Sequence, residues 1–473
     1  HQFVDLVGRS PSRSAPLPME NDEAYPVHML DGTNTLRGAI VSWTLCFNDV
    51  LDSDKLHSSL FRLLEIGDWR KVGGRLRLKD DGDLEIRVPR LFTTDRPAIS
   101  FSHQSLAMNL NDHPLGKKLP VATEVASIQT GPQEFRAFAA REDAPTTLED
   151  FLYQDVPQLS LHITSFNDAT LVGLMAAHAY GCYGSAGTAS QLVSCPRRPG
   201  IGSASLARRA RGSDMRSCRR ACGEGGDFQM VETRTIFLPK KAVAELRRQA
   251  RVDLAAGDGS GDEPPFLSEG DVLTACVARA VASSLPQPRP VTVLQVLNAR
   301  FRLSSLVSVS GVYIQNMALA AFTFLSPEVA RGPLGPIAME NRRCLTEQST
   351  EGQVLAFLRK LRVMPKPSRD PSMVVCGEPD ALLMPFTNWT RAEFFKTADF
   401  GPAVVRAGDI NKARNNMPGT MVYHHASSMR ESRAARNVIV VLGKDHNEGY
   451  WLTGMLLPPA WVQIQKQINT LSQ

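Results

Sequence analysis

The chain has 473 residues and a mass of 51.8 kDa, and 43% of its residues are hydrophobic and 21% charged. This length predicts two or three domains, and the composition excludes a wholly disordered or collagen-like protein. No run of eighteen apolar residues occurs, which excludes a transmembrane helix, and the first twenty residues lack the apolar stretch of a secretory signal. We therefore expect a cytoplasmic protein of enzyme size.

The net charge of +5 comes from one part of the chain. Residues 179–226 contain eight arginines, no lysine and only two acids, while the rest of the chain is close to neutral. Four of the eight cysteines also lie there. The other four are scattered, as reduced cytosolic cysteines usually are.

The first half of the chain predicts alternating helices and strands. In order, the pattern indicates a strand over 35–47, a helix capped by Ser53, a hairpin over 75–88 around Asp81-Gly82, and a second hairpin over 159–177. The second hairpin ends directly before His178.

The second half continues in the same mixed style. We expect a strand over 233–238, a helix from Pro239 to about Arg251, a loop over 255–265, a helix capped by Ser268 and Asp271, and strands over 291–296, 438–443 and 450–456. No internal repeat occurs.

Several short motifs carry chemistry. His178 follows an apolar strand, which is a rigid position for a catalytic base. It is followed along the chain by Asn298-Ala299-Arg300, by Tyr313 to Met317, by Thr387-Asn388-Trp389 and by Asp399-Phe400-Gly401. This set resembles the BAHD acyltransferases, in particular the fungal branch that includes trichothecene acetyltransferases, and the resemblance covers nearly the whole chain.

The resemblance implies an α/β fold of two similar-sized mixed-sheet domains, like chloramphenicol acetyltransferase, with the active site in a channel between them. We expect a first domain over 1–215 that carries His178. A second domain over 216–473 would carry Arg300 and the loop of Asp399, Phe400 and Gly401.

The family's residue roles transfer to matching positions of this chain. His178 matches the catalytic base, Arg300 matches an arginine that pairs with the motif aspartate, and Asn298, Asp399 and Gly401 match structural positions. We consider Thr387, Asn388 and Trp389 candidates for binding the oxyanion, since such donors contribute roughly 3 kcal/mol each. Anchoring of a strand end is an equally good interpretation of Asn388 and Trp389.

Two features depart from the family pattern. Cys182 stands where the motif after His178 has its aspartate, and Pro402 and Ala403 replace a Trp-Gly pair. A one-nucleotide shift of plausible codons over 179–184 can spell Leu-Met-Asp-Ala-Met-Gly, and over 191–214 it can spell a helix and an acidic loop. We interpret residues 179–226 as an out-of-frame translation, so the form as written is expected to be impaired. A genuine divergent insert is the alternative.

The same segment admits two other interpretations. Cys182, Cys195, Cys218 and Cys222 lack the paired two-residue spacings of a zinc site, so we expect no metal. Its arginines lack the aromatic residues of a nucleic-acid platform, so we expect no nucleic-acid partner.

The predicted function is acyl-CoA-dependent O- or N-acyl transfer, with acetyl transfer to a hydroxyl of a fungal secondary metabolite as the first choice. Acyl-CoA would be a co-substrate with no bound cofactor, and we expect a monomer without membrane contact. Two rivals remain open: a non-transferring relative of the same fold, acting as a binding protein or a cyclase-like enzyme, and a carrier-dependent condensation domain.

Overall fold

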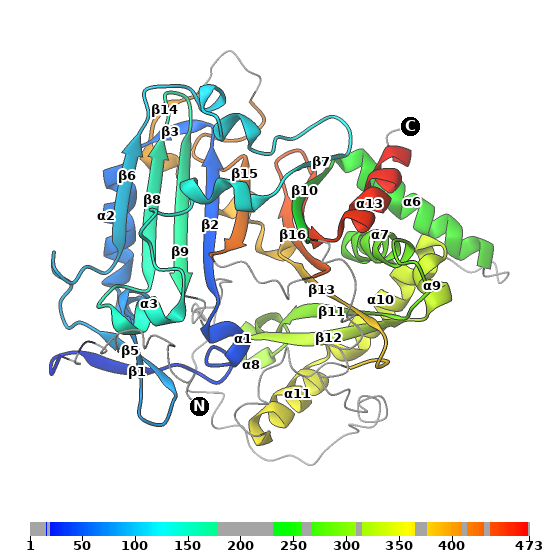
Figure 1. The fold of residues 1–473 in the computed structure, drawn as a ribbon, viewed down its shortest axis with the longest axis horizontal. Helices are drawn as coiled ribbons and strands as arrows, with labels where there is room; N and C mark the ends of the chain where they lie inside the picture. Colours follow the sequence, from blue (N-terminus) through cyan, green and yellow to red (C-terminus); the bar gives the residue numbers. More distant parts are fainter. Residues whose placement is uncertain are drawn as a thin grey trace, which may run out of the picture.

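The protein is built from two main mixed sheets that lie side by side (Figure 1). The computed structural model describes Pro16 and residues 19–177, 230–257, 266–308, 315–364, 376–408, 414–429 and 436–471. Within these ranges, no helix combines the length and the apolar character that crossing a membrane requires. His178 and the segment 179–226 lie outside the described residues.

The first sheet has five strands in the order β15-β2-β9-β8-β6. The bounds are β2 Ile40–Phe47, β6 Ser100–Ser105, β8 Leu159–Ser165, β9 Thr170–Ala177 and β15 Tyr423–Ser428. All neighbours are antiparallel except β6 and β8, which are parallel. The predicted hairpin before His178 is confirmed, because β8 and β9 pair from Ser165 opposite Thr170 onward.

A smaller sheet in the order β1-β5-β4 packs against this one, with bounds β1 Glu23–Pro26, β4 Arg75–Leu78 and β5 Leu84–Val88. The β4–β5 hairpin around Gly82 is confirmed, and Gly82 has a φ of +79°, which glycine adopts without steric cost.

The second main sheet has seven strands in the order β12-β11-β13-β16-β17-β10-β7. The bounds are β7 Ser127–Thr130, β10 Glu232–Leu238, β11 Val291–Asn298, β12 Ala318–Leu325, β13 Leu382–Asn388, β16 Val438–Lys444 and β17 Tyr450–Leu456. Strands β11, β13 and β16 run parallel, and their neighbours on both sides are antiparallel. The predicted late antiparallel pair, β16 and β17, is confirmed.

The two halves of the chain exchange strands. Strand β7 comes from the first half and pairs with β10 in the seven-stranded sheet, whereas β15 comes from the second half and pairs with β2. A short pair of β3 (Asp49–Leu51) and β14 (Val404–Ala407) adds a further connection. The predicted domain boundary at residue 215 lies outside the described residues.

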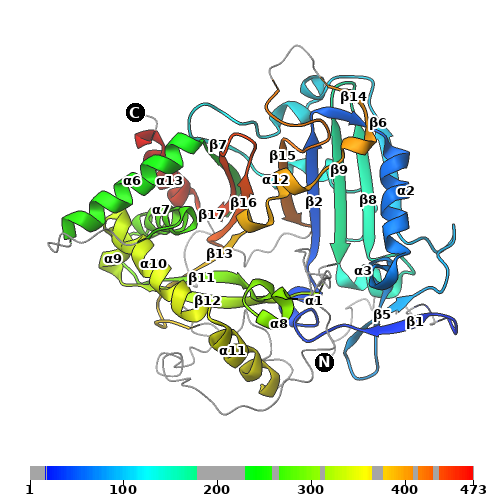
Figure 2. The ribbon, with the colours of Figure 1, turned by 180° about the vertical axis from the view of Figure 1, so that it is seen from behind.

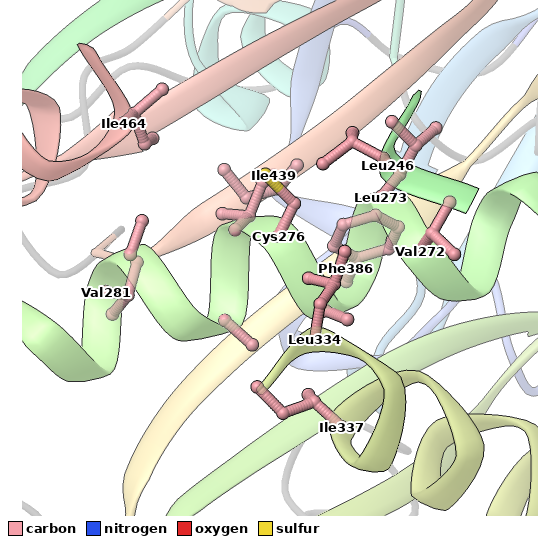
Figure 3. Close-up of a cluster of buried hydrophobic side chains, with 14 of the residues drawn as sticks. Leu246, Val272, Leu273, Cys276, Val281, Leu334, Ile337, Phe386, Ile439 and Ile464 are labelled. Carbon is pink, nitrogen blue, oxygen red and sulfur yellow. The ribbon is translucent and has the colours of Figure 1, made fainter. Parts of the chain in front are cut away.

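Four helices cover the side of the seven-stranded sheet that faces away from the five-stranded sheet (Figures 1 and 2). They are α6 Lys240–Gly257, α7 Glu269–Ser283, α10 Leu334–Gln348 and α13 Pro458–Thr470. Helix α7 is apolar on all sides and lies between the sheet and the other helices, so almost all of its side chains are buried. Figure 3 shows Val272, Leu273 and Cys276 of α7 among side chains of the surrounding core.

The remaining elements are short or peripheral. Helix α2 (Ser53–Leu64) packs on one face of the five-stranded sheet (Figure 2). The other helices of the described ranges are α1 Asn34–Arg37, α3 Leu148–Tyr153, α8 Ser304–Val307, α9 Pro327–Arg331, α11 Glu351–Val363 and α12 Phe394–Thr397. Short 3₁₀ turns span Gly67–Gly73, Leu110–Asp112, Gly116–Lys118, Pro132–Phe138, Ala299–Phe301, Thr390–Ala392 and Gly401–Ala403.

Three sequence predictions of element ends were wrong. The N-cap of α2 is Asp52, which accepts the Lys55 N–H at 2.9 Å, because the helix begins one residue earlier than predicted. Helix α6 continues to Gly257, beyond the predicted end at Arg251 and into the predicted loop. The expected strand over 35–47 begins only at Ile40, since Asn34–Arg37 form α1.

Candidate active site

A cavity of about 1190 Å³ opens where β11 and β13 end. These strands are parallel neighbours, so their carboxyl ends meet at one edge of the sheet, where α/β proteins commonly bind ligands. All five motif residues predicted near these strand ends line the cavity: Asn298, Arg300, Thr387, Asn388 and Trp389. Residues 90 positions apart in the chain are thus brought to one site.

Strands β11 and β13 end in the same way. The Asn298 side-chain oxygen accepts the Arg300 N–H at 3.1 Å, and the Asn388 side-chain oxygen accepts the Thr390 N–H at 2.9 Å. An asparagine that accepts the N–H two residues on imitates a backbone turn, so each strand passes directly into a 3₁₀ turn. The anchoring interpretation of Asn388 therefore has a definite contact, while its amide N–H₂ group stays a candidate donor.

Arg300 is almost fully buried, at 3% exposed. Two of its contacts go to neutral oxygens: the Asn298 side chain at 3.5 Å and the Gln315 carbonyl. These contacts hold the turn after β11 against the segment that leads into β12. The side chain thus shapes the cavity wall from behind.

The backbone of Thr387, Asn388 and Trp389 is held by the neighbouring strand. Thr387 and Asn388 pair with β16, and the Trp389 N–H donates to the Val441 carbonyl at 2.9 Å. The Trp389 ring meets the Phe394 ring edge-on, with 6.3 Å between ring centroids. The backbone of the three oxyanion candidates is therefore held rigidly by strand β16.

A buried polar network forms one end of the cavity, and the sequence did not predict it. Asp271, at 1% exposed, completes the capping box of α7 and also accepts bonds from Asn341 and Arg342. Asn341 in turn accepts from Gln295 at 3.0 Å and from Thr323 at 2.9 Å. The capping box was visible in the sequence, whereas its link to Asn341 and Arg342 depends on the packing of α10 against α7.

A second unpredicted group lies at the start of α7. The Tyr450 hydroxyl donates to the Glu269 carboxylate at 2.9 Å, and the Lys444 ammonium lies 2.8 Å from the same carboxylate. Burial, together with the Glu269 charge, raises the pKa of Tyr450 well above its usual value. Tyr450 therefore presents a neutral hydroxyl at the cavity wall.

Asp399 and Gly401 lie away from the cavity. The Asp399 side chain accepts the Gly401 N–H at 2.8 Å, and Asp399 forms a bridge with Thr420. The segment 414–420, which contains Thr420, is tied to the first half of the chain by a bidentate ion pair from Arg414 to the buried Asp49. These contacts place Asp399 within the packing of its own loop.

His178 is the predicted site residue that the structure does not describe. Its predecessor Ala177 is the last residue of β9 and pairs with Ile40 at the start of β2. Leu36, four residues before Ile40, lines the cavity. Strand β9 thus ends beside the start of β2, four residues after a cavity-lining residue. Among the described residues, no group of three or more His, Cys, Asp and Glu side chains could hold a metal ion.

Comparison with known proteins identifies the class. No family model matches the chain. It is 33% identical to the O-acetyltransferase PaAT-2 of Phomopsis amygdali, over 95% of this chain and 98% of that protein. It is 32% identical to the acetyltransferase pyiB of Pyricularia grisea, over 98% and 96%. The chain belongs to the same family as these fungal acetyltransferases, and it is an acyltransferase by class.

Solved structures confirm the predicted fold. Trichothecene acetyltransferase TRI101 of F. sporotrichioides, crystallised with coenzyme A and T-2, aligns with a TM-score of 0.60 at 12% identity, over 93% of this chain and 96% of that one. Vinorine synthase aligns with a TM-score of 0.52 at 14% identity, over 97% and 96%. The two-sheet α/β architecture is thus the one that the resemblance implied.

Proposed function

We propose that the protein transfers an acetyl-sized acyl group from acyl-CoA to a hydroxyl, or an amine, of a fungal secondary metabolite. The observation that carries the proposal is the cavity at the ends of β11 and β13, which gathers all five motif residues. Its volume lies just above the usual range for small-molecule sites, which suits a reaction with two substrates. TRI101, a structural neighbour, was crystallised with coenzyme A.

His178 is proposed as the general base. Strand β9 is central in its sheet, with β2 on one side and β8 on the other, so its last residue is rigidly held. An imidazole with an unperturbed pKa near 6.5 can accept a proton at neutral pH, and such catalysis contributes about 10²- to 10⁴-fold in rate.

The proposed reaction needs no acyl-enzyme. His178 takes the proton of the acceptor hydroxyl as its oxygen attacks the thioester carbonyl, and a tetrahedral oxyanion forms. Thr387, Asn388 or Trp389 would donate to that oxyanion. Collapse breaks the carbon–sulfur bond, and the CoA thiolate leaves with the proton that His178 returns, giving the ester and CoA.

The proposal includes a monomer that works in the cytoplasm without a membrane or nucleic-acid partner. Cys46, Cys276, Cys344 and Cys376 are buried and free, which suits a reducing compartment. Burial raises the pKa of the Cys46 thiol to about 12, so that thiol stays protonated and unreactive. Light scattering of the purified protein tests the monomer, and a fluorescent fusion in the producing fungus tests the location.

A non-transferring role is the second candidate. One curated relative, 32% identical over 98% of each chain, is named transcriptional regulator calD in Penicillium decumbens. Cys182 in place of the motif aspartate and Pro402 in place of the motif tryptophan also favour loss of activity. In this second reading, the protein would bind a small molecule in the same cavity without turnover.

One experiment separates the candidates. The chain as written, a version with 179–226 restored to the alternative frame, and the His178→Ala variant of that version are compared by thiol release from acetyl-CoA. The acceptors are hydroxylated terpenoids, alkaloids and polyketides. We expect turnover by the restored version, about a hundredfold less by the chain as written, and at least a hundredfold less by His178→Ala. Equal activity of the first two would show that 179–226 is a genuine insert, and full activity of His178→Ala would remove the base.

A further inference from the structure

The cavity wall carries more positive than negative side chains. Among the residues that the structure describes, six charged side chains line the cavity: Glu269, Asp271, Arg300, Arg302, Arg342 and Arg391. The two carboxylates already have cationic partners, since Arg342 Nε lies 2.8 Å from Asp271 and Lys444 Nζ lies 2.8 Å from Glu269. Neither acid is therefore available to neutralise the remaining arginines.

Arg302 and Arg391 are the arginines in excess. Among the described residues, neither guanidinium has an ion pair or a hydrogen bond. Arg302 ends the turn after β11, and Arg391 lies in the turn after β13, so both extend from the asparagine-capped strand ends described above. The two side chains thus stand at the edge where α/β sheets commonly bind ligands.

A ring contact joins the two turns that carry these arginines. Arg391 stacks on the ring of Phe301, with 3.9 Å from its Cζ to the ring centroid, and Phe301 directly precedes Arg302. Burial lowers the pKa of Arg302, and the positive charges of Arg391 and Arg342 lower it further. These like charges repel one another, and a bound anion would relieve that repulsion.

We infer that Arg302 and Arg391 form an anion-binding subsite in the cavity wall that takes a phosphate or carboxylate group of a substrate. This inference rests on the proposed function and names the chemistry of one of its ligands. Guanidinium groups suit both anions, because each offers several N–H donors in a planar fork. The anion has two sources in the proposed reaction: a phosphate of CoA or a carboxylate on the acceptor.

The test measures binding and kinetics in the full chain. The variants are Arg302→Gln, Arg391→Gln, their double variant and Arg391→Lys. Arg343→Gln is the matched control, since Arg343 also lies on a cavity helix, is exposed, and pairs with Glu340 and Glu347. Calorimetry measures adenosine 3′,5′-bisphosphate, CoA and pantetheine, which lacks the phosphates of CoA. Steady-state kinetics compare a hydroxylated acid with its methyl ester as acceptors.

With a phosphate ligand, the double variant binds CoA and the bisphosphate roughly 10- to 100-fold more weakly, while pantetheine and the Arg343→Gln control are unchanged. With a carboxylate ligand, CoA binding is unchanged, and KM rises by a similar factor for the acid but not for its ester. Arg391→Lys should keep part of the affinity in either case.

Two results would overturn the subsite: unchanged binding and KM in the double variant, or equal weakening of every ligand including pantetheine, which indicates a structural effect. Absence of thiol release by the version with 179–226 restored would count against the proposed function alone. Weaker bisphosphate binding by the double variant would support the subsite even then.

Discussion

The Trp43 indole N–H donates to Nδ1 of His424 at 3.0 Å, which joins strand β2 of the first half of the chain to strand β15 of the second. The imidazole is fully buried and packs against the rings of Phe394 and Phe395. Because Nδ1 accepts this bond, His424 must be neutral. The connection between the two halves therefore depends on an uncharged histidine.

Stability should fall in mild acid because of His424 and its neighbour. Burial lowers the pKa of His424 and of His425 to about 3 each. Below about pH 6.5 the two histidines become protonated in the unfolded chain but stay neutral in the folded chain. The free energy of unfolding is therefore highest above pH 6.5 and decreases as pH falls toward 3. At pH 5, each histidine should cost about 2 kcal/mol relative to pH 8.

Urea unfolding at pH 8 and pH 5 measures this effect. The His424→Gln variant should show a smaller loss of stability between the two pH values than the wild-type protein. His57→Gln serves as the control, since His57 lies on the outer helix α2 and is only half-buried. An identical pH dependence in wild type and His424→Gln would contradict the assignment.

The two asparagine caps can be tested as a pair. Asn298→Ala and Asn388→Ala should each lower the free energy of unfolding by about 1 kcal/mol, because each removes the acceptor of a turn N–H. Asn388→Ser should restore most of this stability through its hydroxyl. Thermal unfolding measures the contribution of the caps to stability, and kcat of Asn388→Ser measures the contribution of the Asn388 amide to catalysis. A hundredfold loss of kcat would identify this amide as an oxyanion donor, and an unchanged kcat would remove it from the candidates.

Asp271→Asn should be strongly destabilising. The buried carboxylate accepts hydrogen bonds from Ser268, Asn341 and Arg342, whereas the asparagine amide has only one acceptor oxygen. The positive charge of Arg342 would also lose its ion-pair partner. We expect a loss of about 3 kcal/mol. Asp150→Asn is the matched control, since Asp150 completes the capping box of α3 but is half-buried, and it should cost about 1 kcal/mol. Equal losses in denaturant unfolding would show that the network beyond the capping box contributes nothing.

Gly419→Ala should disrupt the loop that carries Asp399. Gly419 has a φ of +78°, and an added Cβ would overlap the backbone of Gly401. Gly82 has nearly the same φ, +79°, but open space around it. Gly82→Ala should therefore cost only about 1 kcal/mol of backbone strain, and Gly419→Ala considerably more. Similar melting temperatures for the two variants would contradict this close packing.

Local patterns in the sequence predicted local structure well. The hairpins β4–β5 and β8–β9 were correct because each is set by a short turn between alternating strands. The predicted capping box was also correct, because its two residues, Ser268 and Asp271, are only three positions apart in the sequence. The cap of α2 was misplaced by one residue because Asp52 and Ser53 are both good capping residues, and only the backbone geometry distinguishes them.

Long-range structure was not predictable from such patterns. Nothing local in β7 or β15 indicates that each pairs with strands from the other half, since the partners lie over 100 residues away. The motif residues at the ends of β11 and β13 were found only through the family resemblance. Arg302, Arg391 and the network around Asn341 had no such motif, and their significance depends on which side chains the fold brings together.

The exchange of β15 has a consequence for synthesis on the ribosome. Strand β2, which lies between β9 and β15 in the folded protein, is translated almost 380 residues before β15. Until then, an apolar strand has one unpaired edge, which can pair with the same edge of another nascent chain. The second half of the chain must therefore emerge before the first sheet can close. A ribosome that stalls or terminates in the middle of the message would release a fragment prone to aggregation, so we expect truncated products to be found with chaperones and in the insoluble fraction.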